Sequence, residues 1–199
     1  MKNILITGAN RGIGLMFAQS FADVVNTVYG TARDINNCDE LKKIKNIEIL
    51  ELDLLDKNSI KSFCAEVKDI PFDLILNNAG TFQDEQMEET NLDPELWLDE
   101  IMINAIGPIT LTQKLKENLM SGVDKKVVFI SSQMGSIDDN YSGGYYFYRT
   151  SKSRSRESGG FGLGLYLCKQ IVLAHQGLLS ISNHEEKGAV ITIQIPMEQ

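Results

Sequence analysis

The chain has 199 residues, of which 43% are hydrophobic and 23% charged, which suits one globular domain and is short for two. Its net charge of −8 argues against nucleic acid or an anionic membrane as a partner, because either would favour a basic face. No apolar run is long enough to cross a bilayer. Cys38, Cys64 and Cys168 are odd in number and lack zinc-ligand or redox spacing, so a cytoplasmic protein without a metal site is expected.

Apolar runs of strand length alternate along the chain with stretches of helical period. The runs expected as strands are 4–7, 27–31, 47–52, 74–76 and 127–131, and the stretches expected as helices are 13–21, 57–67 and 94–119. This alternation predicts an α/β fold with a doubly wound parallel sheet in three layers. Such sheets bind their ligands at the carboxyl ends of the strands.

A glycine-rich loop follows the first expected strand and opens the first expected helix. It reads Thr7-Gly8-Ala9-Asn10-Arg11-Gly12-Ile13-Gly14. Its glycines permit a tight turn and a close approach to a diphosphate, and the helix N-terminus supplies N–H donors. The spacing resembles the T-G-x-x-x-G-x-G loop of the short-chain dehydrogenases, a Rossmann-like family, and so predicts a dinucleotide site. A plain structural turn is the alternative.

The end of the second expected strand indicates which dinucleotide is bound. An acidic residue there would hold the 2′-hydroxyl of NAD, but the chain has Arg33, and the glycine loop adds Arg11. Two guanidinium groups suit a 2′-phosphate. Asp34 weighs slightly against this interpretation, and the expectation remains NADP(H) in preference to NAD(H).

A second motif strengthens the resemblance to the short-chain dehydrogenases. Asn77-Asn78-Ala79-Gly80 directly follows the fourth expected strand, and Asp53 follows the third. In that family the N-N-A-G motif supports the sheet beside the cofactor, and the acid at the position of Asp53 contacts the adenine. The cofactor-binding residues that the resemblance implies are Thr7, Gly8, Asn10, Arg11, Gly12, Ile13, Gly14, Arg33, Asp53, Leu54, Asn78, Ala79, Gly80, Tyr148 and Lys152.

A tyrosine and a lysine four positions apart suggest the reaction. On a helix Tyr148 and Lys152 would share a face, where an ammonium favours the phenolate. They resemble the acid/base pair of the family. By the same resemblance Ser132 orients the substrate carbonyl and Asn104 completes the catalytic set through a bound water. Ser131 and Ser136 are near enough to leave the choice of serine open.

Together the motifs resemble the carbonyl-reductase-like branch of the family over residues 1–153. The resemblance implies an oxidoreductase that transfers hydride between NADP(H) and a small-molecule carbonyl or alcohol, with Tyr148 as acid/base. It does not identify the substrate. The family usually forms homodimers through the helices that carry Asn104 and Tyr148, and the oligomeric state of this chain stays open.

The sequence changes character after Ser153. Four glycines fall within 159–164, where the family has a helix interior, and each weakens a helix by about 1 kcal/mol relative to alanine. Within the C-terminal fragment 154–199, residues of about 156–197 instead resemble the end of the ATP-binding domain of sensor histidine kinases, with a glycine box at 162–165, a helix near 168–175, and two closing strands at 178–183 and 189–196. We therefore expect a chimera, in which an atypical C-terminal helix and a two-strand extension complete the first domain or are appended to it.

The sequence alone leaves three candidate functions open. The complete catalytic set favours an active dehydrogenase. The P-G loop that normally positions the nicotinamide is missing, which favours a catalytically impaired, dinucleotide-binding chimera. An ATP-binding kinase fragment is the third, but the asparagine-bearing helix and the D-x-G-x-G box of the kinases have no counterpart, so kinase activity does not carry over.

Overall fold

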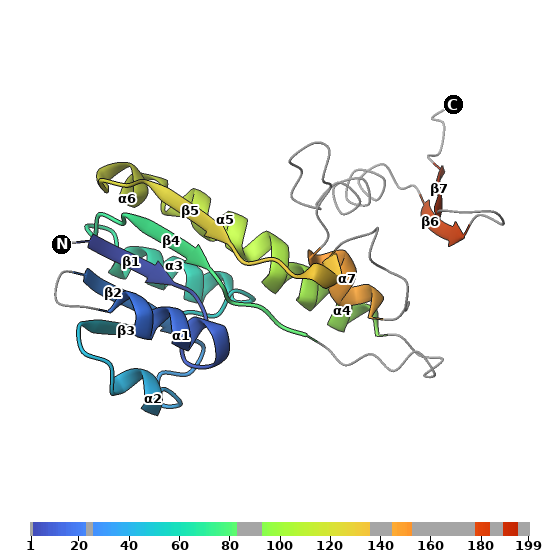
Figure 1. Cartoon of the computed structure of the whole chain (residues 1–199). Coiled ribbons are helices and arrows are strands. Elements are labelled where there is room, and N and C mark those ends of the chain that lie inside the picture. The colour runs from blue at the N-terminus through green and yellow to red at the C-terminus, as the bar shows by residue number, and fades with distance from the viewer. Residues whose placement is uncertain are drawn as a thin grey trace. The chain divides into compact units, whose positions relative to one another are not determined.

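A computed structural model (Figure 1) describes residues 2–22, 26–82, 93–135, 145–152, 178–183 and 189–194. The chain divides into two compact units, Met1–Ser153 and Arg154–Gln199. Within the described residues, no helix is both long and apolar enough to cross a membrane.

A five-stranded parallel sheet forms the centre of the first unit, in the order β3-β2-β1-β4-β5. Its strands are β1 (Lys2–Ile6), β2 (Asn26–Ala32), β3 (Ile47–Glu51), β4 (Leu74–Asn77) and β5 (Lys126–Phe129). Each lies within two residues of its expected range. The strand order reverses between β1 and β4. The chain places β2 and β3 on one side of β1, and then β4 and β5 on the other side. The predicted doubly wound α/β fold is confirmed.

Helices cover both faces of this sheet (Figure 1). The helices are α1 (Gly12–Phe21), α2 (Asp39–Lys42), α3 (Lys57–Glu66), α4 (Pro94–Ile101), α5 (Gly107–Lys114), α6 (Lys116–Ser121) and α7 (Tyr146–Lys152). Side chains alternate along β1, so Leu5 joins the core beneath α3 and α5, whereas Ile4 and Ile6 join the core beneath α1 and α2. Both cores exclude water, and each fully buried leucine or isoleucine contributes about 2 kcal/mol.

The expected helix at 94–119 is interrupted twice, at residues 102–106 and at Leu115, which separates α5 from α6. A π-turn, η1 (Met102–Ile106), separates α4 from α5, and the N–H of Gly107 donates to the carbonyl of Met102, five residues back. Pro108 explains the first interruption, because proline has no N–H for the carbonyl of residue i−4 and its ring collides with that group in an α-helix. Residue i−4 is Asn104, so the irregular turn carries one of the predicted catalytic residues.

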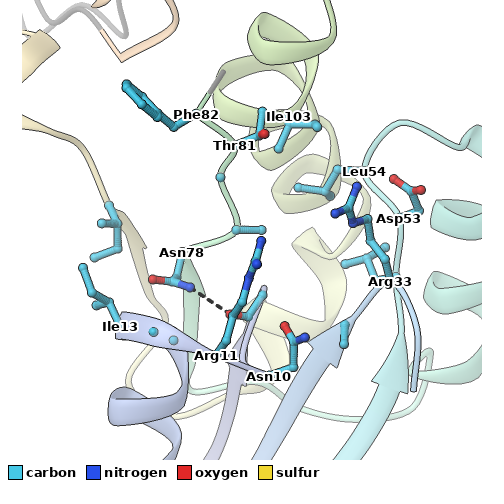
Figure 2. A pocket seen from close by; sticks show the side chains of 18 of the residues that line it. Asn10, Arg11, Ile13, Arg33, Asp53, Leu54, Asn78, Thr81, Phe82 and Ile103 are labelled. Carbon is cyan, nitrogen blue, oxygen red and sulfur yellow. Dashed lines mark hydrogen bonds between the residues drawn. The ribbon is translucent and has the colours of Figure 1, made fainter. Parts of the chain in front are cut away.

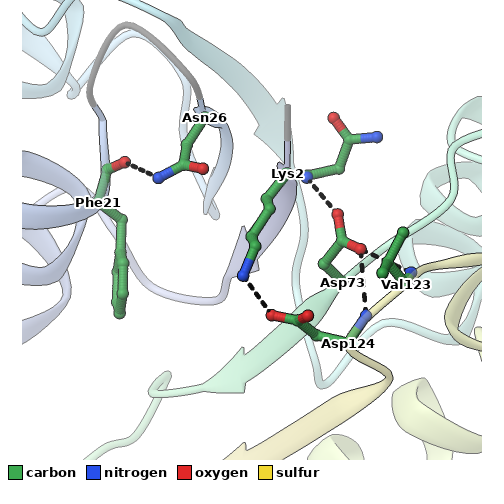
Figure 3. A network of polar contacts seen from close by, with 7 residues as sticks. Lys2, Phe21, Asn26, Asp73, Val123 and Asp124 are labelled. Carbon is green, nitrogen blue, oxygen red and sulfur yellow. Dashed lines mark hydrogen bonds and ion pairs between the residues drawn. The ribbon is translucent and has the colours of Figure 1, made fainter.

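A buried carboxylate fastens the amino ends of the strands (Figure 3). Asp73 is 4% exposed and accepts from the N–H groups of Asn3 at 2.8 Å, Val123 at 2.7 Å and Asp124 at 3.4 Å. The Lys2 ammonium donates to Asp124 at 2.6 Å. Burial raises the pKa of Asp73, but the three N–H groups and Lys2 outweigh it, so the pKa lies below its ordinary value.

The second unit contains two described strands, β6 (Leu178–Asn183) and β7 (Ala189–Gln194). They pair antiparallel, with Leu178 opposite Gln194, as expected for the closing strands. They form a two-stranded sheet of their own. The expected glycine box and C-terminal helix lie outside the described residues.

Candidate dinucleotide site

A cavity of about 640 Å³ lies at the carboxyl ends of the strands (Figure 2). Its lining comes from the ends of the strands and the segments that follow them, including the first turn of α1, and from η1 and α7. The residues that line it are Gly8, Asn10, Arg11, Gly12, Ile13, Gly14, Ala32, Arg33, Asp34, Asn37, Leu52, Asp53, Leu54, Asn78, Ala79, Gly80, Thr81, Phe82, Ile103, Ile130, Ser131, Ser132, Tyr148 and Lys152. Every cofactor residue predicted from sequence is among them except Thr7, and so is every predicted catalytic residue except Asn104.

The glycine loop is held in a shape that favours glycine. Gly8 and Gly12 have φ of +64° and +54°, the left-handed region that side chains disfavour. A Cβ on Gly14 would lie 2.2 Å from the Gly8 carbonyl oxygen and 2.5 Å from Asn78 Nδ2, so α1 begins in direct contact with the loop. A Cβ on Gly12 would meet nothing within 4 Å. The loop therefore exposes bare backbone to the cavity there.

Two neutral side chains tie the glycine loop to the segment after β4. Thr7 is fully buried, and its Oγ1 accepts from the N–H groups of Asn78 at 3.1 Å and Ala79 at 3.0 Å. In return, Asn78 Nδ2 donates to the carbonyls of Thr7 at 3.0 Å and Gly8 at 3.1 Å. Thr7 thus shapes the site from behind without lining it.

Two arginines line the cavity from separate loops. Figure 2 shows the side chains of Arg11, from the glycine loop, and Arg33, from the loop after β2, both reaching into it. Asn10 Nδ2 donates to the carbonyl of Asn37 at 3.4 Å, which joins the same two loops. Asp34 also lines this part of the cavity. Two positive side chains, Arg11 and Arg33, therefore line this part of the cavity, and the negative charge of Asp34 partly offsets them.

The segment after β3 is braced by its own side chains. Asp53 Oδ1 accepts from the N–H of Leu55 at 2.9 Å, and the N–H of Asp53 donates to Ser59 Oγ at 2.8 Å. These bonds fix the turn between β3 and α3. As a result Asp53 and Leu54 both reach the cavity wall.

The predicted acid/base pair lies on α7. Tyr148 and Lys152 both line the cavity, together with Ser131 and Ser132. Lys152 Nζ donates to the carbonyl of Ile130 at 3.3 Å. Burial lowers the pKa of this lysine, and the charge of Glu100 partly opposes the effect.

The two serines of the cavity make different hydrogen bonds. Ser131 Oγ donates to the carbonyl of Lys152 at 3.2 Å. Ser132 Oγ accepts from the N–H of Met134 at 3.2 Å, which leaves its hydroxyl proton for another acceptor.

Asn104 stands behind this wall. Its Oδ1 accepts from the N–H of Thr81, and its Nδ2 donates to the carbonyl of Thr81 and to Ser151 Oγ, all at 2.9 Å. Ser151 Oγ in turn donates to the carbonyl of Tyr148 at 2.8 Å. The amide of Asn104 therefore joins the segment after β4 to α7, and it does not face the cavity.

Comparison with known proteins identifies the family. The family of short chain dehydrogenases matches residues 2–155. The chain belongs to the short-chain dehydrogenases. An uncharacterized oxidoreductase of Saccharomyces cerevisiae is 33% identical over 144 residues, which cover 67% of this chain and 56% of the relative. The chain spans about half the length of the curated relatives it matches.

Solved structures and one relative of a different kind complete the comparison. The NADPH-bound carbonyl reductase from chicken fatty liver superposes with a TM-score of 0.66 at 31% identity, over 76% of this chain and 66% of that one. The signal transduction histidine-protein kinase BaeS of Escherichia coli is 40% identical over 75 residues, 37% of this chain and 16% of the kinase.

This short-chain dehydrogenase also lines its cavity with residues that the motifs did not indicate. The ring of Phe82 packs edge-on against Tyr148, with centroids 4.9 Å apart, and Ile103 and Ile130 add apolar surface. Phe82 lies two residues beyond N-N-A-G, where no pattern marks it. In the sequence, only its position close to N-N-A-G could have indicated that Phe82 lines the cavity. Among the described residues, no group of three or more His, Cys, Asp or Glu could hold a metal.

Proposed function

We propose that the protein is an NADP(H)-dependent oxidoreductase that transfers hydride between NADP(H) and a carbonyl or alcohol, with Tyr148 as acid/base. One observation carries the proposal: a single cavity is lined by the glycine loop, by both arginines, and by Ser132, Tyr148 and Lys152. The carbonyl reductase of similar fold that binds NADPH supports the same cofactor.

The residues of the cavity fit a dinucleotide. The left-handed glycines and the bare backbone at Gly12 allow a diphosphate to approach the N-terminus of α1, where N–H groups and the helix dipole favour anions. Arg11 and Arg33 supply the charge that a 2′-phosphate requires. Asp53 and Leu54 form the wall beyond them, where the resemblance expects adenine.

The catalytic residues divide the remaining work. The bound cofactor supplies or accepts the hydride. Tyr148 donates a proton to the carbonyl oxygen during reduction, and accepts it during oxidation. The ammonium of Lys152 holds the nicotinamide ribose. Ser132 hydrogen-bonds the same carbonyl oxygen with its hydroxyl, while Ser131 is engaged with the backbone of α7, which favours Ser132 as the catalytic serine. Asn104 fixes α7 through Ser151 and, in the family, completes the set through a water.

A second candidate function concerns residues 154–199. The resemblance of their motifs to the end of a histidine kinase domain, the partial match of the chain to a histidine kinase and the missing P-G loop support a chimera that binds dinucleotide without efficient turnover. ATP binding by the kinase-like segment is the weaker form of this alternative, because only the end of that domain is present. The cytoplasmic location and a homodimer remain predictions.

A fluorescence titration with NADPH, NADH and ATP in parallel tests these proposals. We expect NADPH to bind more tightly than NADH, and ATP not at all. The Arg33→Ala variant should lose about 10- to 150-fold in NADPH affinity and keep its NADH affinity, because a hydrogen bond to a charged group is worth about 1.5–3 kcal/mol. Lys45→Ala, which removes an exposed cation outside the cavity, is the control. A folded protein that binds neither dinucleotide would overturn the proposal.

Turnover separates the two candidates. Tyr148→Phe should abolish ketone reduction and lower NADPH affinity only a few-fold, because the ring that lines the cavity stays. If the unaltered chain binds NADPH but reduces none of a panel of ketones and aldehydes, the impaired chimera is the correct function.

A further inference from the structure

Asp34 is an acid of the cavity that the proposed function leaves without a task. It follows Arg33 in the loop after β2 and lines the cavity beside Arg11 and Arg33, where its charge opposes a 2′-phosphate. An acid at the end of the second strand can instead hold the 2′-hydroxyl of NAD. The hydrogen bonds of the loop indicate a different use of this carboxylate.

The carboxylate of Asp34 is bonded to its own loop. Its Oδ1 accepts from the N–H of Asn36 at 2.9 Å, the local bond by which aspartate closes a turn. The backbone carbonyl of Asp34 accepts from the N–H of Asn37 at 3.2 Å and from the thiol of Cys38 at 3.4 Å. Three hydrogen bonds therefore meet at Asp34 and fold residues 34–38 into a turn.

The turn has a fixed support on either side. Cys38 is 1% exposed and belongs to the core beneath α1 and α2. On the other side, the carbonyl of Asn37 accepts from Asn10 Nδ2 of the glycine loop at 3.4 Å. Arg33 is exposed and directly precedes the turn, and Figure 2 shows its side chain within the cavity. The arginine therefore extends from a backbone that is held in place.

We propose that Asp34 is a positioning residue for cofactor selection: its carboxylate closes the turn that holds Arg33 ready for a 2′-phosphate, and it does not bind the ribose. The inference rests on the proposed function for the identity of the dinucleotide. It adds that the acid beside Arg33 contributes to NADP(H) selection through the backbone, although its charge alone would oppose that selection.

A closed turn matters because a loop must be ordered before its side chain can bind. A loop that is ordered in the free protein does not lose that conformational freedom during binding, so more of the interaction between arginine and phosphate appears as affinity. The charge of Asp34 acts in the opposite direction, through a repulsion that water and salt screen. The two effects can be separated because asparagine keeps an acceptor oxygen at this position and removes the charge.

The first experiment compares Asp34→Asn with Asp34→Ala in titrations with NADPH and NADH. Both variants lose the charge, but only asparagine can accept from the N–H of Asn36. We expect Asp34→Asn to bind NADPH at least as tightly as the unaltered protein, and Asp34→Ala to bind it about 2- to 10-fold more weakly than Asp34→Asn. NADH affinity should be nearly the same in all three proteins.

Two results of this comparison would overturn the proposal. One is equal NADPH affinity in the two variants, which would mean that the turn does not depend on the acceptor oxygen. The other is a loss of NADH affinity in both variants, which is the result expected of an acid that holds the 2′-hydroxyl.

Asp39 provides the matched control. It is an exposed acid of α2 that is not among the residues that line the cavity. Asp39→Asn and Asp39→Ala remove the same charge close to the same loop, and their NADPH affinities should be equal. A difference between them as large as the difference at Asp34 would show that the effect does not come from the turn, and would overturn the proposal.

A double-variant cycle tests whether Asp34 acts through Arg33. In an Arg33→Ala background, the NADPH affinities of Asp34→Asn and Asp34→Ala should differ by less than about twofold, because no guanidinium remains to be positioned. An undiminished difference would overturn the positioning role.

Adenosine 2′,5′-bisphosphate, titrated by calorimetry, makes the test independent of the nicotinamide and of turnover. We expect Asp34→Asn to bind it more tightly than Asp34→Ala. If the unaltered chain binds this compound but not NADPH, the proposed function fails and the comparison of the two variants still tests the role of Asp34. A folded chain that binds neither compound would overturn both proposals. Binding of both compounds with no difference between the variants would overturn the inference about Asp34 alone.

Discussion

At the carboxyl ends of the strands, the side chains of Thr7 and Asn78 hydrogen-bond to the backbone of neighbouring loops. At the amino ends, the side chains of Asp73 and Asn118 do the same. Asn118 Nδ2 donates to the carbonyls of Val67 at 2.6 Å and Ile70 at 2.9 Å. Each end also contains a glycine with no room for a side chain. The two ends differ in charge: the ties beside the cavity are neutral, and the opposite end uses a carboxylate.

The difference follows from what each end must bind. A buried carboxylate behind the glycine loop would repel a diphosphate, so neutral hydroxyl and amide groups suit that position. The amino ends bind no anion in the proposed function, and a carboxylate that accepts several N–H groups makes stronger bonds than a neutral acceptor. Stability and binding should therefore respond separately to changes at the two ends.

The largest effects are expected from the two close-packed glycines. A Cβ on Gly14 would lie 2.2 Å from the Gly8 carbonyl oxygen, and one on Gly122 would lie 2.0 Å from that of Phe72. Alanine at either position should lower the free energy of unfolding by about 3 kcal/mol, measured by urea titration. NADPH affinity should fall more than 100-fold in Gly14→Ala and stay unchanged in folded Gly122→Ala. Equal loss of affinity in both would break the separation.

Asp73→Asn should lower the free energy of unfolding by about 2–3 kcal/mol, because charged hydrogen bonds to Asn3 and Val123 are lost. The pKa of Asp73 is depressed by folding, so its contribution is complete above the unfolded value of about 4 and is lost as pH falls through the folded value. Urea midpoints between pH 7 and pH 3 should therefore converge for variant and unaltered protein at the acid end. Asp69→Asn, at an exposed acid, serves as control and should change little.

Thr7→Val tests the neutral tie. The methyl group keeps the shape but leaves the N–H groups of Asn78 and Ala79 without their acceptor, and an unsatisfied buried donor destabilises by about 1–3 kcal/mol. NADPH binding should weaken as well, since Asn78 and Ala79 line the cavity. Thr7→Ser keeps the hydroxyl and should preserve both properties. If Val and Ser behave alike, the hydroxyl is not the tie.

Lys2→Gln should have the smallest effect. The Lys2 and Asp124 side chains are 53% and 27% exposed, and exposed ion pairs contribute little because water and salt screen them. We expect the urea midpoint at physiological salt to be unchanged. A clear loss would mean that Lys2 supports Asp73 through the network of Figure 3 rather than only Asp124.

Local patterns in the sequence were enough to predict the sheet and most of the cavity lining. Apolar runs predict strands β1 to β5. The glycine loop and N-N-A-G come directly after strands β1 and β4 in the sequence. Helix α2 was missed because its four residues are too few to show a period. The break at Met102–Ile106 was missed although Pro108 marks it, since the apolar pattern continues on both sides.

Other features depend on contacts between distant segments. Asp73 sits at the start of a strand like many surface acids, and only the approach of Asn3 and Val123 shows that it is buried. The orientation of Asn104 away from the cavity likewise depends on Thr81 and Ser151. Glu100 is fully buried on α4, which packs against α7, and helical period alone does not specify this burial.

The π-turn at Met102–Ile106 has a consequence for how the chain tolerates substitution. It holds more residues per turn than an α-helix, in which successive side chains are about 100° apart. The faces of α4 and α5 are therefore out of phase, although the two helices run on without a loop. A saturation scan of residues 94–114 should show a helical rhythm of sensitive and permissive positions that slips at Asn104 and resumes at Gly107. Any alignment that reads this stretch as one uninterrupted helix would assign inward and outward positions wrongly on one side of the slip.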